Sequence, residues 1–229
     1  EWKRPSAHYH RSNRGGGEWE FFDLPEQWNI HYRDLTFNLK PFSFKHTGLF
    51  PEQAVNWDWF SDIINKSRKK LKVLNLFAYT GGATVAAAKA GAEVVHVDAA
   101  KGMVAWAKEN AKLSGLEAAP IRYIVDDCVK FVEREIRRGN TYDAIIMDPP
   151  SYGRGTKGEI WKIEESIYPF IEKCTKLLSD KPLFLLINSY TTGLQAGVLN
   201  TMIKLALKER FPQAKSSADE LGIPVKKST

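Results

Sequence analysis

Acidic residues stand at the ends of three successive apolar stretches in the middle of this chain. Asp98 ends the stretch EVVHVD, Asp126 and Asp127 follow IRYIV, and Asp148 follows AIIM. A carboxylate at such a position can accept hydrogen bonds from the hydroxyl or amino groups of a ligand. An aspartate there can equally be an ordinary helix cap. Because three consecutive strands would end in acids on the same sheet edge, we favour a binding site for a nucleotide-type ligand.

A glycine pair lies between the first of the predicted strands and the next helix. In VLNLFAYTGGATVAAA, residues 73–88, a buried strand leads into Thr80, Gly81 and Gly82, and an alanine-rich helix begins at once. Glycine lets the backbone approach a ligand closely, and the start of a helix offers unpaired N–H groups. An ordinary strand-to-helix turn is the alternative explanation.

The spacing of these glycines and acids favours S-adenosylmethionine over a dinucleotide. The turn reads YTGGAT and not GxGxxG, the pattern that holds a pyrophosphate. S-adenosylmethionine has no phosphate and needs a close backbone approach to its aminoacyl end. Asp98 would accept hydrogen bonds from both ribose hydroxyls, and either Asp126 or Asp127 would accept from the adenine amino group. We favour Asp127, which starts the next helical segment, and we expect Ala99 to pack on the adenine face.

The stretch AIIMDPPSYGR raises the question of what an acid followed by two prolines could do. Pro149 and Pro150 remove backbone donors and stop the strand, so Asp148 would begin a stiff shelf at the strand end. Such a shelf suits a flat base, on which Tyr152 could stack; a stiffened turn with a solvated aspartate is the alternative. Residues 153–162 contain three glycines and three cations, so we expect a mobile basic loop that either clamps phosphates or acts as a solvated lid.

These residues need a framework of alternating strands and helices to bring them together. Hydrophobic patterning from residue 72 onward predicts a Rossmann-like α/β fold, doubly wound around a mainly parallel sheet. The predicted strands cover residues 73–77, 93–97, 121–125, 144–147 and 183–188. The predicted helices cover residues 83–90, 102–114, 129–138, 159–178 and 194–210.

The chain before this pattern has a different character. We expect residues 1–50 to form a small β-rich extension, residues 51–71 a linking helix and a basic connector, and residues 72–229 the catalytic domain that binds the cofactor. The linking helix would cover residues 51–65, with Pro51 at its first position. The strands predicted in the extension are residues 18–22, 28–32 and 36–39.

Composition limits the classes of function. Of 229 residues, 43% are hydrophobic, and the net charge of +6 permits a polyanionic partner without requiring one. Two cysteines without a CxxC pair argue against a disulfide framework and against a structural zinc site, so a reducing cytoplasm is the expected location. His8 and His10 alternate as metal ligands do, but no acid or thiol cluster accompanies them in the sequence, so we expect no metal site. No apolar run has membrane-spanning length, and the oligomeric state is left open.

Three of the motifs, VLNLFAYTGGATVAAA, VHVD and DPPSYGRGTKGE, resemble those of class I S-adenosylmethionine-dependent methyltransferases. The resemblance is to the branch that includes bacterial 23S ribosomal RNA methyltransferases making 5-methylcytosine or 7-methylguanine. FKHTGLFPEQAVNWDW, residues 44–59, is similar to a segment that packs over the methionine end of the cofactor in that branch. The resemblance covers about residues 44–190 and implies a seven-stranded sheet with an antiparallel last strand. We expect that strand to be incomplete here, since the chain stops at ELGIPVKKST.

The resemblance assigns roles to particular residues. Asp98 would hold the ribose and Asp127 the adenine, and Phe50 and Gln53 would close the site from the N-terminal side. The residues lining the methionine part of the cofactor would be Thr80, Gly81 and Gly82. The full set of expected cofactor contacts is Phe50, Gln53, Phe77, Tyr79, Thr80, Gly81, Gly82, Asp98, Ala99, Asp126, Asp127 and Asp148. The residues expected where the methyl group is transferred are Asp148, Pro149, Pro150 and Tyr152.

One departure from that branch bears on the acceptor atom. Methylation at carbon 5 of cytosine needs a cysteine nucleophile, which follows the fifth strand in the resembling enzymes. Here that stretch is LLINSYTTGL, residues 185–194, and Cys128 and Cys174 read as buried small hydrophobic residues. We therefore predict a methyltransferase that modifies a base in ribosomal RNA by direct SN2 transfer, at a nitrogen and not at a carbon. The alternatives are a methyltransferase for a small molecule or a protein, and a non-catalytic RNA-binding module that keeps the fold.

Overall fold

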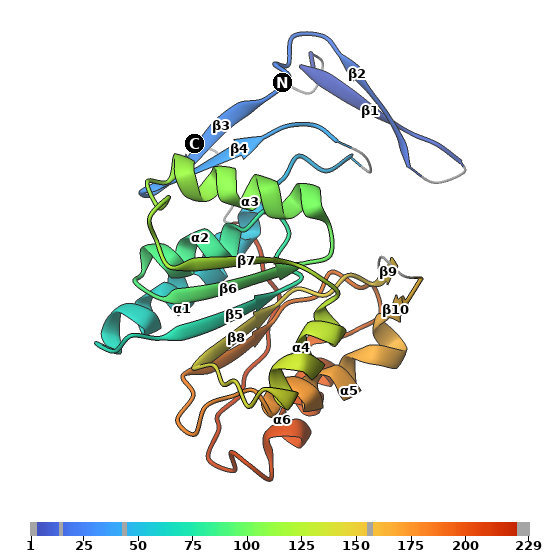
Figure 1. The fold of residues 1–229 in the computed structure, drawn as a ribbon. Coiled ribbons are helices and arrows are strands. Elements are labelled where there is room, and N and C mark those ends of the chain that lie inside the picture. The colour runs from blue at the N-terminus through green and yellow to red at the C-terminus, as the bar shows by residue number, and fades with distance from the viewer. Residues whose placement is uncertain (1–3, 14–15, 43–44, 155–157, 224–229) are drawn as a thin grey trace, which may run out of the picture.

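The centre of the molecule is a sheet of five parallel strands, in the order β11–β8–β5–β6–β7 (Figure 1). The computed structural model describes residues 4–13, 16–42, 45–154 and 158–223. The order reverses between β5 and β8, which is the switch point of a doubly wound sheet. The predicted fold class is confirmed. The five strands are β5 (Lys72–Leu76), β6 (Glu93–Asp98), β7 (Ile121–Val125), β8 (Ala144–Met147) and β11 (Phe184–Ile187).

Helices cover both faces of the sheet, as crossover connections between parallel strands require (Figure 1). One face carries α4 (Cys128–Arg137), α5 (Ile163–Thr175) and α6 (Ala196–Leu207). The other carries α1 (Ala54–Lys66), preceded by the 3-10 turn η2 (Pro51–Gln53), together with α2 (Gly82–Lys89) and α3 (Lys101–Leu113). Among the described residues, no helix combines the length and the apolar character that crossing a bilayer would require.

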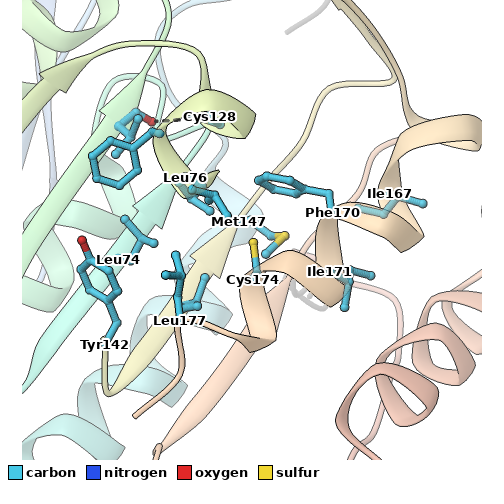
Figure 2. Close-up of a cluster of buried hydrophobic side chains, with 14 of the residues drawn as sticks. Leu74, Leu76, Cys128, Tyr142, Met147, Ile167, Phe170, Ile171, Cys174 and Leu177 are labelled. Carbon is cyan, nitrogen blue, oxygen red and sulfur yellow. Dashed lines mark hydrogen bonds between the residues drawn. The ribbon is translucent and has the colours of Figure 1, made fainter. Parts of the chain in front are cut away.

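Successive residues of the central strands point into two different cores. On β5, Leu74 and Leu76 belong to the cluster under α4, α5 and α6, whereas Val73 belongs to the cluster under α1, α2 and α3. Both faces of these strands are buried, and for this reason their sequences are continuous apolar runs without alternation. Figure 2 shows the first cluster, in which Met147 of β8 lies beside Phe170 of α5.

Two antiparallel hairpins precede the sheet, as the β-rich character of this segment predicts. β1 (Ala7–Arg11) pairs with β2 (Gly17–Phe21), and β3 (Trp28–Tyr32) pairs with β4 (Leu35–Leu39). The second hairpin packs on the main body, since Phe37 of β4 is fully buried with its ring centroid 5.2 Å from that of Trp57 in α1.

β1 is a strand that the sequence did not reveal, because AHYHR contains no run of apolar or β-branched residues. Its pairing with β2 places Glu20 directly opposite His8. An acid therefore does accompany the two histidines of this strand, contrary to the expectation from the sequence.

The segment after the two prolines also differs from the prediction. A short antiparallel hairpin, β9 (Tyr152–Arg154) and β10 (Ile160–Lys162), replaces most of the expected basic loop and the first turn of the expected long helix. The helix begins only after β10, because Trp161 is buried and its Nε1 donates to the Pro150 carbonyl at 2.7 Å. Residues 155–157 of the expected loop lie outside the described residues.

The seven-stranded sheet implied by the resemblance is not confirmed. Within residues 188–223, the regular element that the structure describes is α6, and β11 forms one edge of the five-stranded sheet. The two further strands remain a prediction.

Candidate active site

The carboxyl ends of the middle strands meet at one edge of the sheet. The parallel registers place the last residues of β6, β5 and β8 side by side. Asp98 and Asp148 therefore lie at the ends of the two strands that flank β5, with the loop after β5 between them. Asp126 joins the same edge, because its backbone N–H donates to the Asp98 carbonyl at 3.0 Å. Three of the predicted acids are thus brought together.

The loop after β5 has an unusual backbone. Phe77, Tyr79 and Gly81 have φ angles of 53°, 50° and 83°, and this left-handed region costs a residue other than glycine on the order of 1–3 kcal/mol. Two hydrogen bonds hold the loop in place: Tyr79 N–H donates to Asp98 Oδ2 at 2.8 Å, and Phe77 N–H to Cys128 Sγ at 3.2 Å. Backbone strain of this kind concentrates where a protein binds a ligand.

Asp98 is fixed by two backbone donors, since Ala100 N–H donates to its Oδ1 at 2.8 Å while Tyr79 N–H occupies Oδ2. Burial raises the pKa of this carboxyl, and the two hydrogen bonds oppose the rise. Each carboxylate oxygen has two acceptor positions, so both can receive a further hydrogen bond. This pair of acceptor oxygens fits the adjacent hydroxyls of a ribose, which would donate to them. Ala99 follows directly and is half-buried.

The glycine pair is explained first by the packing of helices. A Cβ atom on Gly81 would lie 2.7 Å from the Cβ of Ala107 in α3, and one on Gly82 would lie 2.8 Å from the ring of Trp57 in α1. Real Cβ atoms do not come this close, so both positions require glycine whatever the ligand. The expected approach of this backbone to a cofactor stays a prediction.

Thr80 is buried, and its polar groups are used within the protein. Its Oγ1 donates to the Gly48 carbonyl at 2.5 Å, and its own carbonyl accepts from Asn110 Nδ2 at 2.9 Å. Asn110 Oδ1 in turn accepts from Asn38 N–H of β4 at 2.9 Å. Thr80 therefore links the loop after β5 to Gly48, which precedes η2, and through Asn110 to the β3–β4 hairpin.

Asp126 and Asp127 are used differently. Asp127 is the N-cap of α4, and its Oδ1 accepts from Lys130 N–H at 2.9 Å. Asp126 has both oxygens engaged: Oδ1 accepts from Asp127 N–H at 2.9 Å, and Oδ2 pairs with Arg134. The capping alternative is realised at Asp127, but a carboxylate can cap with one oxygen and bind a ligand with the other.

The ends of β8 and β11 form a second group of polar residues. Asn188 Nδ2 donates to Asp148 Oδ1 at 3.0 Å. Burial raises the pKa of Asp148 to about 6, and the charge of Glu52 adds to the rise while the Asn188 hydrogen bond opposes it. Pro149 is buried next to Asp148. Tyr152 lies on β9, half exposed, where its hydroxyl accepts from Arg154 Nε at 3.1 Å.

Tyr190 connects this group to η2. Its hydroxyl donates to Glu52 Oε1 at 2.7 Å and accepts from Gln53 Nε2 at 3.1 Å. Its ring centroid lies 5.1 Å from that of Phe50, which lies 5.8 Å from that of Tyr79. The site residues that the sequence analysis did not name are Glu52, Asn188 and Tyr190. The signal for Asn188 and Tyr190 is the polar run NSY directly after the last apolar strand, and Glu52 has no such signal.

The site therefore has two halves. The two halves are named by the roles expected of their residues, which stay predictions. The cofactor half would comprise residues 77–82, Asp98, Ala99, Asp126 and Asp127. The acceptor half would comprise Phe50, Glu52, Gln53, Asp148, Pro149, Pro150, Asn188 and Tyr190, of which Phe50, Gln53 and Asp148 are also expected to reach the cofactor. A cavity of about 1560 Å³ is lined in part by Glu52, Asn188 and Tyr190. Its other lining residues belong mainly to β11, to α6 and to the chain after α6.

Both cysteines are buried, as predicted. Burial raises the pKa of the Cys128 thiol well above its usual value, and it raises that of Cys174 too. A thiol with a raised pKa stays protonated and is a poor nucleophile. Cys128 serves the cofactor half as an acceptor for Phe77 N–H.

The curated proteins most informative for this chain are ribosomal RNA large subunit methyltransferases K/L. That of Shewanella frigidimarina is 33% identical over 145 residues, which is 62% of this chain and 20% of the relative. That of Pseudoalteromonas atlantica is 34% identical over 144 residues, which is 62% of this chain and 19% of the relative. This chain thus spans about a fifth of the length of these relatives.

The solved structures that share the fold include two in which more than a quarter of the aligned sequence is identical. A methyltransferase from Agrobacterium tumefaciens described as SAM-dependent is 41% identical with a TM-score of 0.86, covering 90% of this chain and 66% of that one. The protein SMU.776, solved in complex with SAH, is 27% identical with a TM-score of 0.71, covering 86% of this chain and 50% of that one. A family model described as S-adenosylmethionine-dependent methyltransferase matches residues 6–166. The chain accordingly belongs to the S-adenosylmethionine-dependent methyltransferases, and S-adenosylmethionine is its cofactor.

Proposed function

We propose that this methyltransferase modifies a nitrogen of a base in ribosomal RNA. The observation that carries the proposal is the Asp148–Asn188 pair at the strand ends. A carboxylate beside a carboxamide offers acceptors and a donor next to each other. Nucleobases with an amino group beside a ring nitrogen or carbonyl present the complementary pattern.

The cofactor half would hold the adenosyl and methionine parts. S-adenosylmethionine supplies an electrophilic methyl group on its sulfonium. Asp98 would accept from the ribose hydroxyls, Asp127 from the adenine amino group, and Ala99 would pack on the adenine face. The backbone that would line the methionine end is that of Phe77, Tyr79, Gly81 and Gly82. Thr80 would support this loop from behind.

Asp148 would orient the acceptor nitrogen and take its proton. Its Oδ2 would accept a hydrogen bond from the acceptor N–H, which directs the nitrogen lone pair toward the methyl group. The methyl group would pass from the sulfonium sulfur, which would leave as a neutral thioether, to the nitrogen, and the N–H proton would pass to this oxygen. The pKa of about 6 makes Asp148 a stronger base than an ordinary aspartate. In-line positioning, helped by the rigid Pro149 and Pro150, would supply much of the remaining acceleration.

A nitrogen acceptor is supported by the state of the two thiols. Carbon 5 of a pyrimidine needs a covalent nucleophile before it can be methylated. Cys128 and Cys174 are buried, and residues 185–194 contain no cysteine. A nitrogen already has a lone pair and needs no covalent nucleophile.

An RNA substrate is supported by the names of the relatives and by charge. The net charge is +6, and Arg154 and Lys162 lie on the β9–β10 hairpin, which is joined to the acceptor half through Trp161 and Pro150. Cations on such a hairpin can contact phosphates, while Tyr152 can stack on a base. A ribosomal RNA substrate would place the protein in the cytoplasm.

The decisive experiment is methyl transfer to ribosomal RNA from a strain that lacks the gene. We expect tritium from labelled S-adenosylmethionine in this RNA but not in RNA from the parent strain, and mass spectrometry of the nucleosides should show an N-methylated base. Label in 5-methylcytosine would overturn the nitrogen assignment. Label in small amines or ribosomal proteins instead of RNA would replace the substrate class. Tight binding of the cofactor without any transfer would favour the non-catalytic RNA-binding alternative.

A further inference from the structure

The β1–β2 hairpin carries a cluster of metal-ligating side chains on one exposed face. Side chains alternate along a strand, so His8 and His10 share a face of β1. The register places Glu20 opposite His8 and Glu18 opposite His10 on the same face. One ligand atom from each of His8, His10 and Glu20 lies within 4.8 Å of the others. His10 Nε2 is 2.7 Å from Glu20 Oε2, and the two imidazole centroids are 4.3 Å apart.

This arrangement has the chemistry of a divalent transition-metal site. Two imidazole nitrogens and one carboxylate oxygen are a ligand set that Zn²⁺ accepts, with bonds of about 2.0–2.2 Å. Such bonds put the ligand atoms roughly 3.3 Å from one another. Small rotations of exposed side chains achieve this, and water can fill the remaining position. We propose that His8, His10 and Glu20 bind one Zn²⁺ ion, or a related divalent transition metal, on the outer face of the hairpin.

The ion would act on the structure of the hairpin. A two-stranded hairpin is marginally stable alone in water, and Figure 1 shows β1 and β2 standing apart from the five-stranded sheet. The other face of the hairpin carries aromatic rings: the Tyr9 and Trp19 centroids are 5.3 Å apart, and Trp19 Nε1 donates to the Phe42 carbonyl at 3.0 Å. A metal that joins β1 to β2 would therefore also hold this aromatic face in position.

Calorimetry with Zn²⁺ on the full chain without a histidine tag tests the proposal. We expect one site in the wild type and its loss in the His8→Ala/His10→Ala variant. Glu20→Gln should weaken Zn²⁺ binding about tenfold or more. Loss of a residue that only hydrogen-bonds to a metal ligand already lowers metal affinity by about 10–100-fold. Two matched controls should bind as the wild type does: His31→Ala, an exposed histidine on β3, and Glu18→Gln, the neighbouring acid on β2.

A second readout separates metal binding from loss of structure. Zn²⁺ should raise the thermal midpoint of the wild type but not that of the double histidine variant, while the two metal-free midpoints should agree. No binding by the wild type, or equal binding by the double histidine variant, overturns the proposal. Neither measurement uses S-adenosylmethionine or RNA, so the result is independent of the proposed function.

Discussion

In the cofactor half, Asp98 is held by the backbone, whereas in the acceptor half Tyr190 is held by side chains from a distant part of the chain. Asp98 accepts from two backbone N–H groups, the farther of them 19 positions away. Tyr190 is bonded to Glu52 and Gln53, which lie 138 and 137 positions away. Backbone donors are fixed by the fold itself, while contacts between exposed side chains cost conformational entropy each time they form.

This difference suggests what each half does. A preorganised loop suits a cofactor that is the same in every cycle. Side chains that can separate at modest cost suit a substrate that must enter and leave. The division into two halves would be wrong if residues of the acceptor half controlled cofactor affinity, or if residues of the cofactor half controlled the binding of RNA.

Asp148→Asn should have the largest effect on transfer. Asparagine keeps the size but cannot take a proton, so we expect the single-turnover rate to fall by about 10²–10³-fold. The affinity for S-adenosylmethionine should change by less than about threefold. The measurements are quenched single-turnover assays with the RNA substrate and calorimetry with the cofactor. Asp62→Asn, in an exposed ion pair on α1, is the control. A large loss of cofactor affinity in Asp148→Asn would show that Asp148 also binds the cofactor, and the two halves would not be separate.

Asp98→Ala should have the largest effect on cofactor binding. The variant loses the ribose acceptor and leaves the N–H groups of Tyr79 and Ala100 without their partner. We expect S-adenosylmethionine to bind about 100-fold more weakly, equivalent to ~2.7 kcal/mol. Asp126→Asn should change affinity only a few-fold, because Asp126 is committed to its ion pair with Arg134 and the adenine amino group is assigned to Asp127. If Asp98→Ala binds the cofactor normally while keeping its thermal midpoint, the ribose assignment is wrong.

The pH dependence of transfer should follow Asp148. Its pKa of about 6 means that the carboxylate, the form able to accept a proton, is lost as the pH falls below that value. We expect kcat/KM to fall about tenfold per pH unit below roughly 6 and to be level above it. Asp148→Asn should abolish this slope in its residual activity.

Protonation of Asp148 does not unfold the protein, so the expected loss of activity at low pH is not a loss of structure through this group. Folding raises the pKa of Asp148 from its ordinary value of 3.8 to about 6, so protonation of this carboxyl favours the folded state. The stability from this group is full below about 3.8 and is lost as the pH rises through about 6. A slope that persists in Asp148→Asn would assign the titration to another residue.

The positions of the acids at the strand ends could be predicted from the sequence, whereas the contacts between distant side chains could not. The apolar runs before Asp98, Asp126 and Asp148 are local signals, and a parallel sheet brings their ends to one edge. The roles of these acids stay predictions. The strained φ angles of Phe77 and Tyr79 leave no mark in the sequence, because neither is a residue that prefers such angles. Glu52 and Tyr190 meet only through tertiary structure, so no spacing reveals them.

The differences in the fold have similar causes. β10 is extended because Trp161 is buried against Pro150, although its sequence continues smoothly into a helix. β1 is defined by its pairing with β2 and not by its own composition. Phe37 of β4 is buried in the same core as Val73, so the extension and the sheet share their packing. The predicted boundary after residue 50 stays a prediction.

Tyr190→Phe should have the smallest effect on methyl transfer, because it removes only one hydroxyl group from the acceptor half. The variant keeps the ring beside Phe50 but removes the hydroxyl that joins Glu52 and Gln53. A hydrogen bond contributes about 0.5–1.5 kcal/mol, so KM for RNA should rise roughly 2–10-fold, with kcat and the cofactor affinity nearly unchanged.

Two comparisons make this small effect interpretable. Tyr168→Phe on α5 removes a tyrosine hydroxyl outside the acceptor half and should leave KM as it is. Glu52→Gln combined with Tyr190→Phe should cost less than the sum of the two, because they share one contact. If Tyr190→Phe instead weakens the binding of S-adenosylmethionine, its hydroxyl supports the loop of Tyr79 through Phe50, and the division of the site into two halves fails.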